Sequence, residues 1–291
     1  MIKRVLLLGA NGQLGSDVQI VCNDDSNIQL IPVTRAQLDV EDPNKIPNIL
    51  DSLGPFDVLL NCTSYHKTDE CEDFIEKALV VNGAAVAQMA NYCNEHGIVF
   101  FHISTDYIFD GKKGKPYVED DAANPLNAYG VSKLAGENFI KAYCKRHFIF
   151  RVSSLFGKSG ASGKGGNFVE TMLRMAKEGK PLRVVSDQVM SPTHTLDIAR
   201  AIREVISNDI QDYGVYHCSG EGECSWYEFA CHIFELTGVK ADVNPIRTSD
   251  FITKARRPQY SVLDNSRLHR IYPMPAWEEA LTEYLKIKEH I

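Results

Sequence analysis

The sequence has no run of about 18 consecutive apolar residues, which is the length that a membrane-spanning helix requires. It also has no excess of positive charge, because 31 Lys and Arg residues stand against 38 Asp and Glu residues and give a formal net charge of −7. These two absences argue against a membrane partner and against a nucleic-acid partner. With 291 residues, the chain is long enough to bury a large core as one or two domains.

The chain also lacks any Cys-x-x-Cys pair. Eight cysteines are scattered along it: Cys22, Cys62, Cys71, Cys93, Cys144, Cys218, Cys224 and Cys231. Cys224, Cys231 and His232 lie near one another, but their spacing matches no common zinc motif. We therefore predict reduced thiols and no metal site.

The apolar run at the N-terminus is too short for a signal peptide, because it meets Gly9 almost at once. With neither a signal peptide nor a membrane span in the pattern, we expect a cytoplasmic protein.

One candidate catalytic motif is Tyr129-Gly130-Val131-Ser132-Lys133. The apolar run Val131, Leu134, Ala135 and Phe139 favours a helix, on which residues four apart share one face. A neighbouring ammonium lowers the pKa of a phenol, so Tyr129 beside Lys133 could protonate a carbonyl that is being reduced. A surface helix with a Tyr and a Lys at this spacing is the alternative.

A glycine loop follows the first predicted strand. Residues 4–8 form a short apolar run, and Gly9-Ala10-Asn11-Gly12-Gln13-Leu14-Gly15 leads from it into a helical pattern through Val18 and Val21. Glycines allow a tight turn and let backbone N–H groups approach a pyrophosphate at the start of a helix. Such loops also occur as plain turns, but this position indicates dinucleotide binding.

The second predicted strand, residues 28–33, leads into Thr34 and Arg35. NAD-specific sites usually place a carboxylate near this point, whereas an Arg suits the 2′-phosphate of NADP. Arg35 therefore favours NADPH, with a solvated surface Arg as the alternative. Slightly later, Asp39 could lie beside the adenine.

Further strands at residues 56–61, 98–103 and 148–152 alternate with helices, including a long helix predicted over about residues 74–94. This alternation predicts an α/β protein with a Rossmann-type, doubly wound parallel sheet. Ligands of such sheets bind beyond the carboxyl ends of the strands. Ser104 and Thr105, which follow the strand at 98–103, are therefore placed where hydroxyls could hold a substrate oxygen.

We expect a dinucleotide-binding domain over residues 1–152, rejoined by about 188–220. Residues 153–187 and 221–291 then form a smaller α/β substrate-binding domain. In this second part Asn167 is expected to cap a helix, and Gly165-Gly166-Asn167 could hold a phosphate or diphosphate there. A simple cap is the alternative.

Taken together, these residues resemble the extended short-chain dehydrogenase/reductases, and more narrowly the dTDP-4-dehydrorhamnose reductases from end to end. The matching stretches are 9–15, 38–40, 104–111, 129–137, 166–168, 187–188, 191–193, 225–230 and 255–258. The resemblance implies reduction of the 4-keto group of a nucleotide-linked 6-deoxysugar, most simply dTDP-4-dehydro-β-L-rhamnose, by NADPH or NADH.

The resemblance also implies roles for single residues. Tyr129 would donate the proton, Lys133 would lower its pKa and hold the nicotinamide ribose, and Thr105 would bond the keto oxygen. The expected cofactor-binding residues are Gly9, Asn11, Gly12, Gln13, Leu14, Gly15, Arg35, Asp39, Val40, Cys62, Thr63, Tyr65, Tyr129 and Lys133. The expected substrate-binding residues are Ser104, Thr105, Asp106, Tyr107, Ser154, Asn167, Thr193 and Arg257. For Asn167, Thr193 and Arg257, a structural cap or a surface charge is the alternative.

Two stretches depart from the family pattern. The family usually reads Thr-Ser-Trp where this chain has Val152-Ser153-Ser154, so an aromatic ring near the sugar is missing. The pattern Ala-Ala-Tyr-Thr-x-Val-Asp becomes Thr63-Ser64-Tyr65-His66-Lys67-Thr68-Asp69, which is more polar. Both departures bear on the identity of the sugar.

Two other functions compete with a reductase. A nucleotide-sugar epimerase would retain bound NAD, and the lack of an acid after the second strand argues against it. A non-catalytic, dinucleotide-binding regulatory subunit would be favoured by loss of the Tyr or the Lys, and both are present. A homodimer is compatible with the resemblance.

Overall fold

A parallel β-sheet of six strands organises the computed structural model, which describes residues 2–160 and 166–291. Its strands are β1 (Lys3–Leu8), β2 (Ile28–Val33), β3 (Val58–Asn61), β4 (Val99–Thr105), β5 (His147–Val152) and β10 (Gly214–His217). They lie in the order β10-β5-β4-β3-β1-β2, and every neighbouring pair is parallel. The strand order reverses at β1, so the carboxyl ends of β1 and β3 flank the crevice where such sheets bind ligands.

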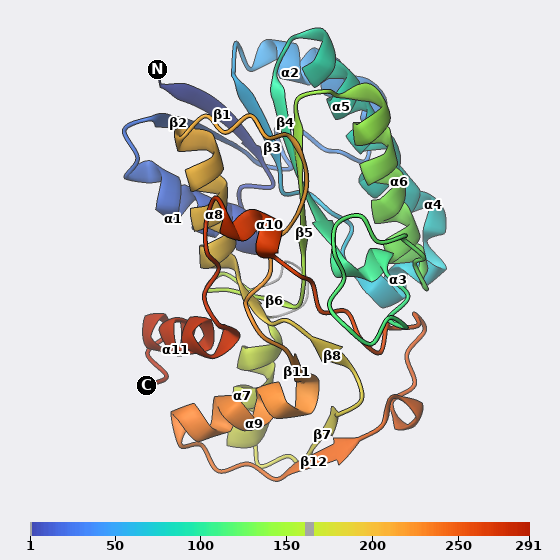
Figure 1. Cartoon of the computed structure of the whole chain (residues 1–291), viewed down its shortest axis with the longest axis vertical. Coiled ribbons are helices and arrows are strands. Elements are labelled where there is room, and N and C mark those ends of the chain that lie inside the picture. The colour runs from blue at the N-terminus through green and yellow to red at the C-terminus, as the bar shows by residue number, and fades with distance from the viewer. Residues whose placement is uncertain (1, 161–165) are drawn as a thin grey trace.

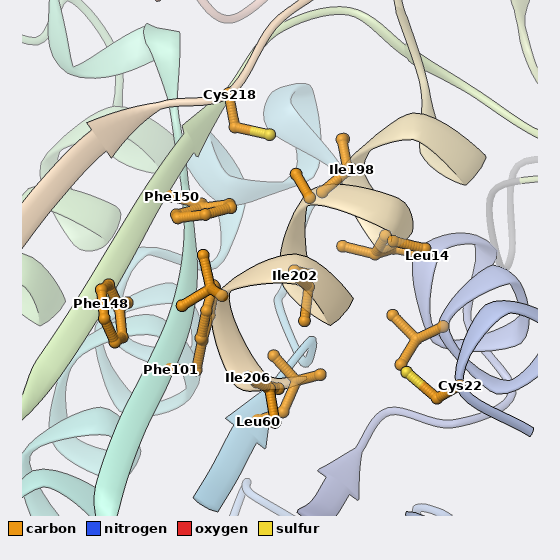
Figure 2. Packing of buried hydrophobic residues seen from close by; sticks show 14 of the residues in the cluster. Leu14, Cys22, Leu60, Phe101, Phe148, Phe150, Ile198, Ile202, Ile206 and Cys218 are labelled. Atoms are coloured by element: carbon orange, nitrogen blue, oxygen red, sulfur yellow. The ribbon is translucent and has the colours of Figure 1, made fainter. Parts of the chain in front are cut away.

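Helices cover both faces of the sheet (Figure 1). One face carries α1 (Gln13–Asn23), α8 (Thr195–Ser207) and α10 (Ser266–His269), and the other carries α2 (Ile46–Ser52), α5 (Ala85–Glu95) and α6 (Ala128–Tyr143). Side chains alternate between the faces along each strand, so Leu7 packs toward α1 and α8 while Leu6 and Leu8 pack toward α2 and α5. Figure 2 shows Ile198, Ile202 and Ile206 of α8 lying against this first face. The predicted fold class is confirmed.

A separate apolar cluster lies in the part of the chain that follows β5, with β10 and α8 returning to the large sheet. Its helices are α7 (Phe168–Lys177), α9 (Trp226–Thr237) and α11 (Trp277–Ile287). Its short strand pairs are β7 (Leu182–Val185) with β12 (Val243–Ile246), and β8 (Val189–Met190) with β11 (Cys224–Ser225). The pair β6 (Leu155–Phe156) and β9 (Thr193–His194) joins this cluster to the end of β5.

The long helix predicted over about residues 74–94 is present as a continuous helical stretch over residues 75–95, but its middle is a π-helical turn, and a separate short helix precedes it. The structure has α3 (Thr68–Asp73), α4 (Ile75–Leu79), the π-helical turn η2 (Val80–Ala84) and then α5. Phe74, with φ −126° and ψ 56°, separates α3 from α4, and its side chain is exposed. The π turn carries the buried Asn82, which hydrogen-bonds to Tyr65 and Ser132 and so ties the loop after β3 to α6. Such turns often occur at functional sites.

The helix predicted around Tyr129 is present as α6, but the apolar run that indicated it does not form its buried face. Val131 is exposed, and Leu134, Ala135 and Phe139 are half-buried. The buried face consists of Gly130, Ser132, Lys133, Gly136, Glu137 and Ile140. It can be this polar because strand β4 and strand β5 supply partners to the buried charges.

Three short 3₁₀ turns complete the described elements: η1 (Pro43–Lys45), η3 (Asp106–Ile108) and η4 (Thr248–Asp250). Among residues 2–160 and 166–291, no helix is long and apolar enough to pass through a membrane.

Candidate active site

A cleft of about 780 Å³ opens beyond the carboxyl ends of β1, β3 and β4. The glycine loop after β1, the loop after β3 and the Tyr129 turn of α6 line it together with residues from the start of α7. The sequence-predicted residues that line it are Gly9, Asn11, Gly12, Gln13, Leu14, Arg35, Asp39, Val40, Cys62, Thr63, Tyr65, Ser104, Thr105, Asp106, Tyr107, Tyr129, Lys133, Ser154, Asn167 and Arg257. Gly15 and Thr193 lie outside this lining.

The glycine loop fits a dinucleotide because side chains have no room there. A Cβ on Gly15 would lie 2.2 Å from the Gly9 carbonyl oxygen, so this glycine lets α1 pack against the loop. Gly9 has φ +78° and passes close to the Cys62 backbone. Gly12, at the N-cap of α1, presents backbone alone, and the first-turn N–H groups of a helix attract a diphosphate. The residues present therefore fit the dinucleotide that the sequence predicts.

Arg35 lies at the far end of the cleft and is largely exposed. Its guanidinium pairs with Asp39 at 3.2 Å and with Glu41 at 2.6 Å, and Glu41 also pairs with Lys77. Glu41 is a cleft-lining acid that the sequence reasoning missed. Exposed ion pairs of this kind are weak, so the guanidinium can exchange its carboxylates for a phosphate at little cost.

Tyr129 lies where a substrate carbonyl could be protonated. Its phenol hydrogen-bonds to the hydroxyls of Thr105 and Ser64, and burial raises its pKa to about 12. We expected Lys133 to lower this pKa, but in the structure the amine of Lys133 bonds to His102 Nε2 at 3.0 Å and to the Ile103 carbonyl at 2.6 Å. The phenol therefore keeps its proton at neutral pH, which is the state that an acid needs.

Lys133 is 1% exposed, and its pKa falls to about 8 because burial penalises the ammonium. Behind it, His102 and Asn61 are each completely buried and bond to one another at 3.1 Å. Sequence reasoning missed both residues. The period of two along β4 was an available signal, because His102 and Ser104 point to the same face, toward Lys133 and Glu137 of α6.

Ser104 was expected to hold substrate, but its hydroxyl donates to Glu137 Oε1 at 2.6 Å. Glu137 also forms a buried ion pair with Arg151 at 2.8 Å, which holds the pKa of the carboxyl below its usual value despite burial. In the structure, Ser104 thus supports α6 from below the cleft.

Asp106 and Tyr107 lie beside Thr105 in the turn η3. Asp106 accepts from Thr105 and Ser153, while burial raises its pKa to about 6. The ring of Tyr107 meets that of Tyr129 edge to face at 6.1 Å between centroids. Arg257 hydrogen-bonds to Tyr107 and pairs with Asp69 at 2.8 Å. Asp69 thus connects α3 to the C-terminal part of the chain.

Two residues of the predicted substrate set, Asn167 and Thr193, bond to other parts of the protein. Asn167 caps α7 by accepting from the Glu170 N–H, and its amide donates to Gly157 and Tyr284. Gly165, which was grouped with it, lies outside the described residues. Thr193 is fully buried and bonds to the Ser191 carbonyl and the Gly220 N–H. Ser154 has φ +45°, an unusual conformation for a residue with a side chain.

Phe168 and Trp226 also line the cleft, with ring centroids 4.7 Å apart. Sequence reasoning missed them as site residues because they begin two helices, α7 and α9, that lie far apart in the chain. The family usually has a Trp where this chain has Ser154. Phe168 and Trp226 therefore supply an aromatic surface in a cleft that lacks that ring.

Away from the cleft, His194, Asp197 and Glu283 bring their ligand atoms within 4.8 Å of one another. Arg200 lies among them and donates to Asp197 at 2.8 Å and to both oxygens of Glu283 at 2.9 and 2.7 Å. A guanidinium therefore neutralises the carboxylates that a metal ion would need.

A doubly wound parallel sheet, a glycine loop at its switch point and a Tyr-x-x-x-Lys helix beside it define a dinucleotide-binding oxidoreductase of the extended short-chain dehydrogenase/reductase class. The RmlD substrate binding domain model matches residues 3–289, and the chain belongs to this family. The family predicted from the sequence is confirmed.

Individual relatives agree with this assignment. The chain is 37% identical to the spore coat polysaccharide biosynthesis protein SpsK of Bacillus subtilis (strain 168), over 97% of each chain. It is 34% identical to dTDP-4-dehydrorhamnose reductase of Escherichia coli (strain K12), over 97% of this chain and 96% of that one. The crystal structure of dTDP-4-dehydrorhamnose reductase from Bacillus anthracis str. Ames in complex with NADP superposes with a TM-score of 0.90 at 35% identity, covering 99% of this chain and 100% of that one.

Proposed function

We propose that this chain uses NADPH or NADH to reduce the 4-keto group of a dTDP-linked 6-deoxysugar, most simply dTDP-4-dehydro-β-L-rhamnose to dTDP-β-L-rhamnose. The observation that carries the proposal is the placement of Tyr129, Lys133 and Thr105 in the same cleft as the glycine loop. Relatives named dTDP-4-dehydrorhamnose reductase over nearly the whole chain support it. The product class fits polysaccharide biosynthesis, which the name of the Bacillus relative also states.

Different residues of this chain bind the cofactor, orient the substrate and supply the proton. The glycine loop holds the diphosphate of the dinucleotide, and Arg35 holds a 2′-phosphate if it is present. Thr105 orients the keto oxygen, and Tyr129 transfers its proton to that oxygen as the carbonyl is reduced. The bound nicotinamide supplies the hydride. Lys133, one turn further along α6 in the same cleft, would hold the nicotinamide ribose.

The substrate side is formed by residues after β4 and from the second half of the chain. Tyr107 lies next to Tyr129, Arg257 bonds to Tyr107, and both can bond sugar hydroxyl or phosphate oxygens. Phe168 and Trp226 provide an apolar surface for a sugar face or a base. The division into domains over 1–152 with 188–220, and over 153–187 with 221–291, stays a prediction, as do a cytoplasmic location and a homodimer.

A second candidate substrate is another dTDP-4-keto-6-deoxyhexose. Ser154 favours it, because a small hydroxyl replaces the aromatic ring that the family resemblance led us to expect near the sugar. A relative from Streptomyces niveus, 32% identical over 97% of this chain, is named dTDP-4-keto-6-deoxy-D-glucose reductase.

The decisive experiment follows NADPH and NADH oxidation at the nicotinamide absorbance, with dTDP-4-dehydro-6-deoxy-L-mannose supplied by the upstream enzymes. We expect rapid oxidation, and faster turnover with NADPH if Arg35 binds the 2′-phosphate. If the nicotinamide cofactor is oxidised with dTDP-4-keto-6-deoxy-D-glucose and not with the L-manno sugar, the second candidate is correct. Binding of either cofactor without oxidation of any 4-keto sugar would contradict the proposal.

A further inference from the structure

A cluster of charged side chains lies at the far end of the cleft, just beyond β2. Its members are Arg35, Asp39, Glu41 and Lys77, whose formal charges cancel. The first three line the same cleft as the glycine loop, whereas Lys77 lies on α4, outside the described lining. Arg35 follows the carboxyl end of β2, where dinucleotide sites hold the ribose 2′-OH or the 2′-phosphate. The cluster therefore lies where the group that distinguishes NADPH from NADH is expected.

Glu41 bridges the two cations of this cluster through a single oxygen. Its Oε1 accepts from the Arg35 guanidinium at 2.6 Å and lies 2.8 Å from the Lys77 ammonium. If Arg35 turns away, this oxygen keeps its contact with Lys77. The Lys77 ammonium is itself held in place, because it lies over the Tyr65 ring at 5.3 Å from the ring centre.

Glu41 competes for Arg35 more strongly than Asp39 does. One oxygen of Asp39 accepts from the Glu41 backbone N–H at 3.0 Å, and the other lies 3.2 Å from Arg35 Nε. The contact between Glu41 and the guanidinium is shorter, at 2.6 Å. Any ligand that takes the Arg35 guanidinium must therefore displace Glu41 first.

A 2′-phosphate disturbs the charge balance of the cluster. It brings about two negative charges near neutral pH, and it needs the guanidinium that Glu41 occupies. Once displaced, the Glu41 carboxylate repels the phosphate unless a second cation stays beside it. Lys77 contacts the oxygen that Arg35 would leave. The 2′-OH of NADH carries no charge and makes no such demand.

We propose that Glu41 and Lys77 together set the preference of this chain between NADPH and NADH. Glu41 competes with the 2′-phosphate for Arg35 and so weakens NADPH binding. Lys77 neutralises Glu41 and so restores part of that binding without touching the cofactor. The inference rests on the cofactor use proposed above, and it means that Arg35 alone does not determine cofactor choice.

Calorimetric titration of the full-length protein with NADPH and, separately, with NADH tests this inference. Glu41→Gln should tighten NADPH binding by at least about fivefold, because it removes the competing charge. Lys77→Met should weaken NADPH binding by at least about threefold, because it leaves the Glu41 charge unopposed. The affinity for NADH should change by less than about twofold in both variants, since NADH lacks the phosphate.

The double variant Glu41→Gln/Lys77→Met tests whether Lys77 acts through Glu41. If it does, the double variant should bind NADPH as tightly as Glu41→Gln alone. If Lys77→Met weakens NADPH binding by the same factor with and without the Glu41 charge, the ammonium contacts the phosphate itself and the inference is wrong. Lys45→Met is the matched control, because its ammonium pairs with Asp42 at 2.8 Å outside the described lining. Its affinity for either cofactor should equal that of the unaltered protein.

Unchanged NADPH affinity in Glu41→Gln or in Lys77→Met would overturn the inference. The expected differences should shrink at an ionic strength of about 1 M, where exposed charges are screened within about 3 Å. Both side chains are partly exposed, at 34% for Glu41 and 39% for Lys77, so the variants should fold, which circular dichroism checks. Because calorimetry needs no sugar, the expected affinities would support these roles even if the chain reduces no 4-keto sugar.

Discussion

Tyr129 holds its proton at neutral pH because burial raises the pKa of its phenol to about 12. A phenol in this state is ready to protonate a developing alkoxide, and the hydroxyls of Thr105 and Ser64 direct it. Lys133 is close in sequence and on the same helix, yet its bonds go to His102 and the Ile103 carbonyl. We therefore propose Tyr129 as the acid, while the bonds of Lys133 hold its amine against β4.

Replacement of Tyr129 by Phe removes the proposed acid and little else. We expect Tyr129→Phe to fold and bind NADPH while turnover falls by about 10² to 10⁴, the usual contribution of a positioned acid. The change is measured from the rate of NADPH oxidation in stopped-flow or steady-state assays. Tyr143→Phe, at the exposed end of the same helix, should leave turnover within about twofold. Equal turnover in both variants would exclude Tyr129 as the acid.

The buried face of α6 contains two charged side chains, Lys133 and Glu137. Lys133 and Glu137 lie one turn apart, and β4 meets them with His102 and Ser104, which are two residues apart. Residues four apart on the helix therefore meet residues two apart on the strand. Arg151 of β5 completes it through its ion pair with Glu137. The polar interface fixes the register of α6 on the sheet and so fixes the position of Tyr129.

Removal of the Glu137 charge should be costly. In Glu137→Gln, Arg151 remains as a buried cation without its carboxylate, which typically costs about 3–5 kcal/mol in the free energy of unfolding. Urea unfolding followed by circular dichroism measures this loss. Lys141→Gln is the control, because its ammonium lies 3.3 Å from the same carboxylate but its side chain is 41% exposed. It should cost less than about 1 kcal/mol, and similar losses in both variants would contradict the argument.

The start of α1 depends on close approach of backbone to backbone. A methyl group in Gly15→Ala would lie 2.2 Å from the Gly9 carbonyl oxygen and push the helix away from the loop. Overpacking of this kind costs about 1–3 kcal/mol, and we expect NADPH affinity to fall by at least about tenfold. Titration calorimetry measures the affinity.

Gly83→Ala serves as the control for that variant, because the added methyl group would meet Ala135 Cβ at an ordinary 3.7 Å. Its NADPH affinity should match that of the unaltered protein. If Gly15→Ala binds equally well, the contact between the loop and α1 does not set the geometry of the dinucleotide site.

In the molecule as a whole, α8 joins the first half of the chain to the second. It packs against α1, and Thr195 at its start donates a hydrogen bond to the buried Asp17 of α1. At its other side, Arg200 pairs with Glu283 of α11. The helix that begins the dinucleotide site is thus connected to the C-terminal helix through one intervening element.

Thr195→Val removes the hydroxyl that bonds to Asp17. Burial already raises the pKa of Asp17, and loss of this bond raises it further, because the bond favours the carboxylate. We expect a loss of about 1–3 kcal/mol in the free energy of unfolding at pH 7. The loss should shrink as pH falls from 7 toward 4 through the raised pKa of Asp17 in the folded protein, because a protonated Asp17 no longer gains from a bond that favours its carboxylate.

Chemical denaturation at pH 7 and pH 4 tests this sign. Ser207→Ala is the matched control, since it removes a hydroxyl bond from the same helix to Asp25, which is half-buried. Its cost should stay below about 0.5 kcal/mol at both pH values. A larger loss at pH 4 than at pH 7 for Thr195→Val would show that Asp17 does not carry the effect.

Much of the site could be predicted because its parts are local in sequence. The glycine loop, the strand end at Thr105 and the spacing of Tyr129 and Lys133 are short patterns whose chemistry is visible in single stretches. Asn61, His102 and Trp226 were missed because each becomes a neighbour of the site through folding, from segments that are far apart in the chain. The alternation of β4 could have indicated His102, but no local pattern indicates Asn61.

The sequence by itself determined the alternation of strands and helices, the dinucleotide loop and the family, because these depend on hydrophobic period, glycine spacing and residue order. The tertiary structure decided which face of α6 is buried, which groups Ser104 and Asn167 hydrogen-bond, and which residues contact Lys133. Those outcomes depend on partners from β3, β4 and β5 that pair buried charges and amides. Burying a polar group costs free energy unless it finds hydrogen-bond partners, and only folding brings these partners together.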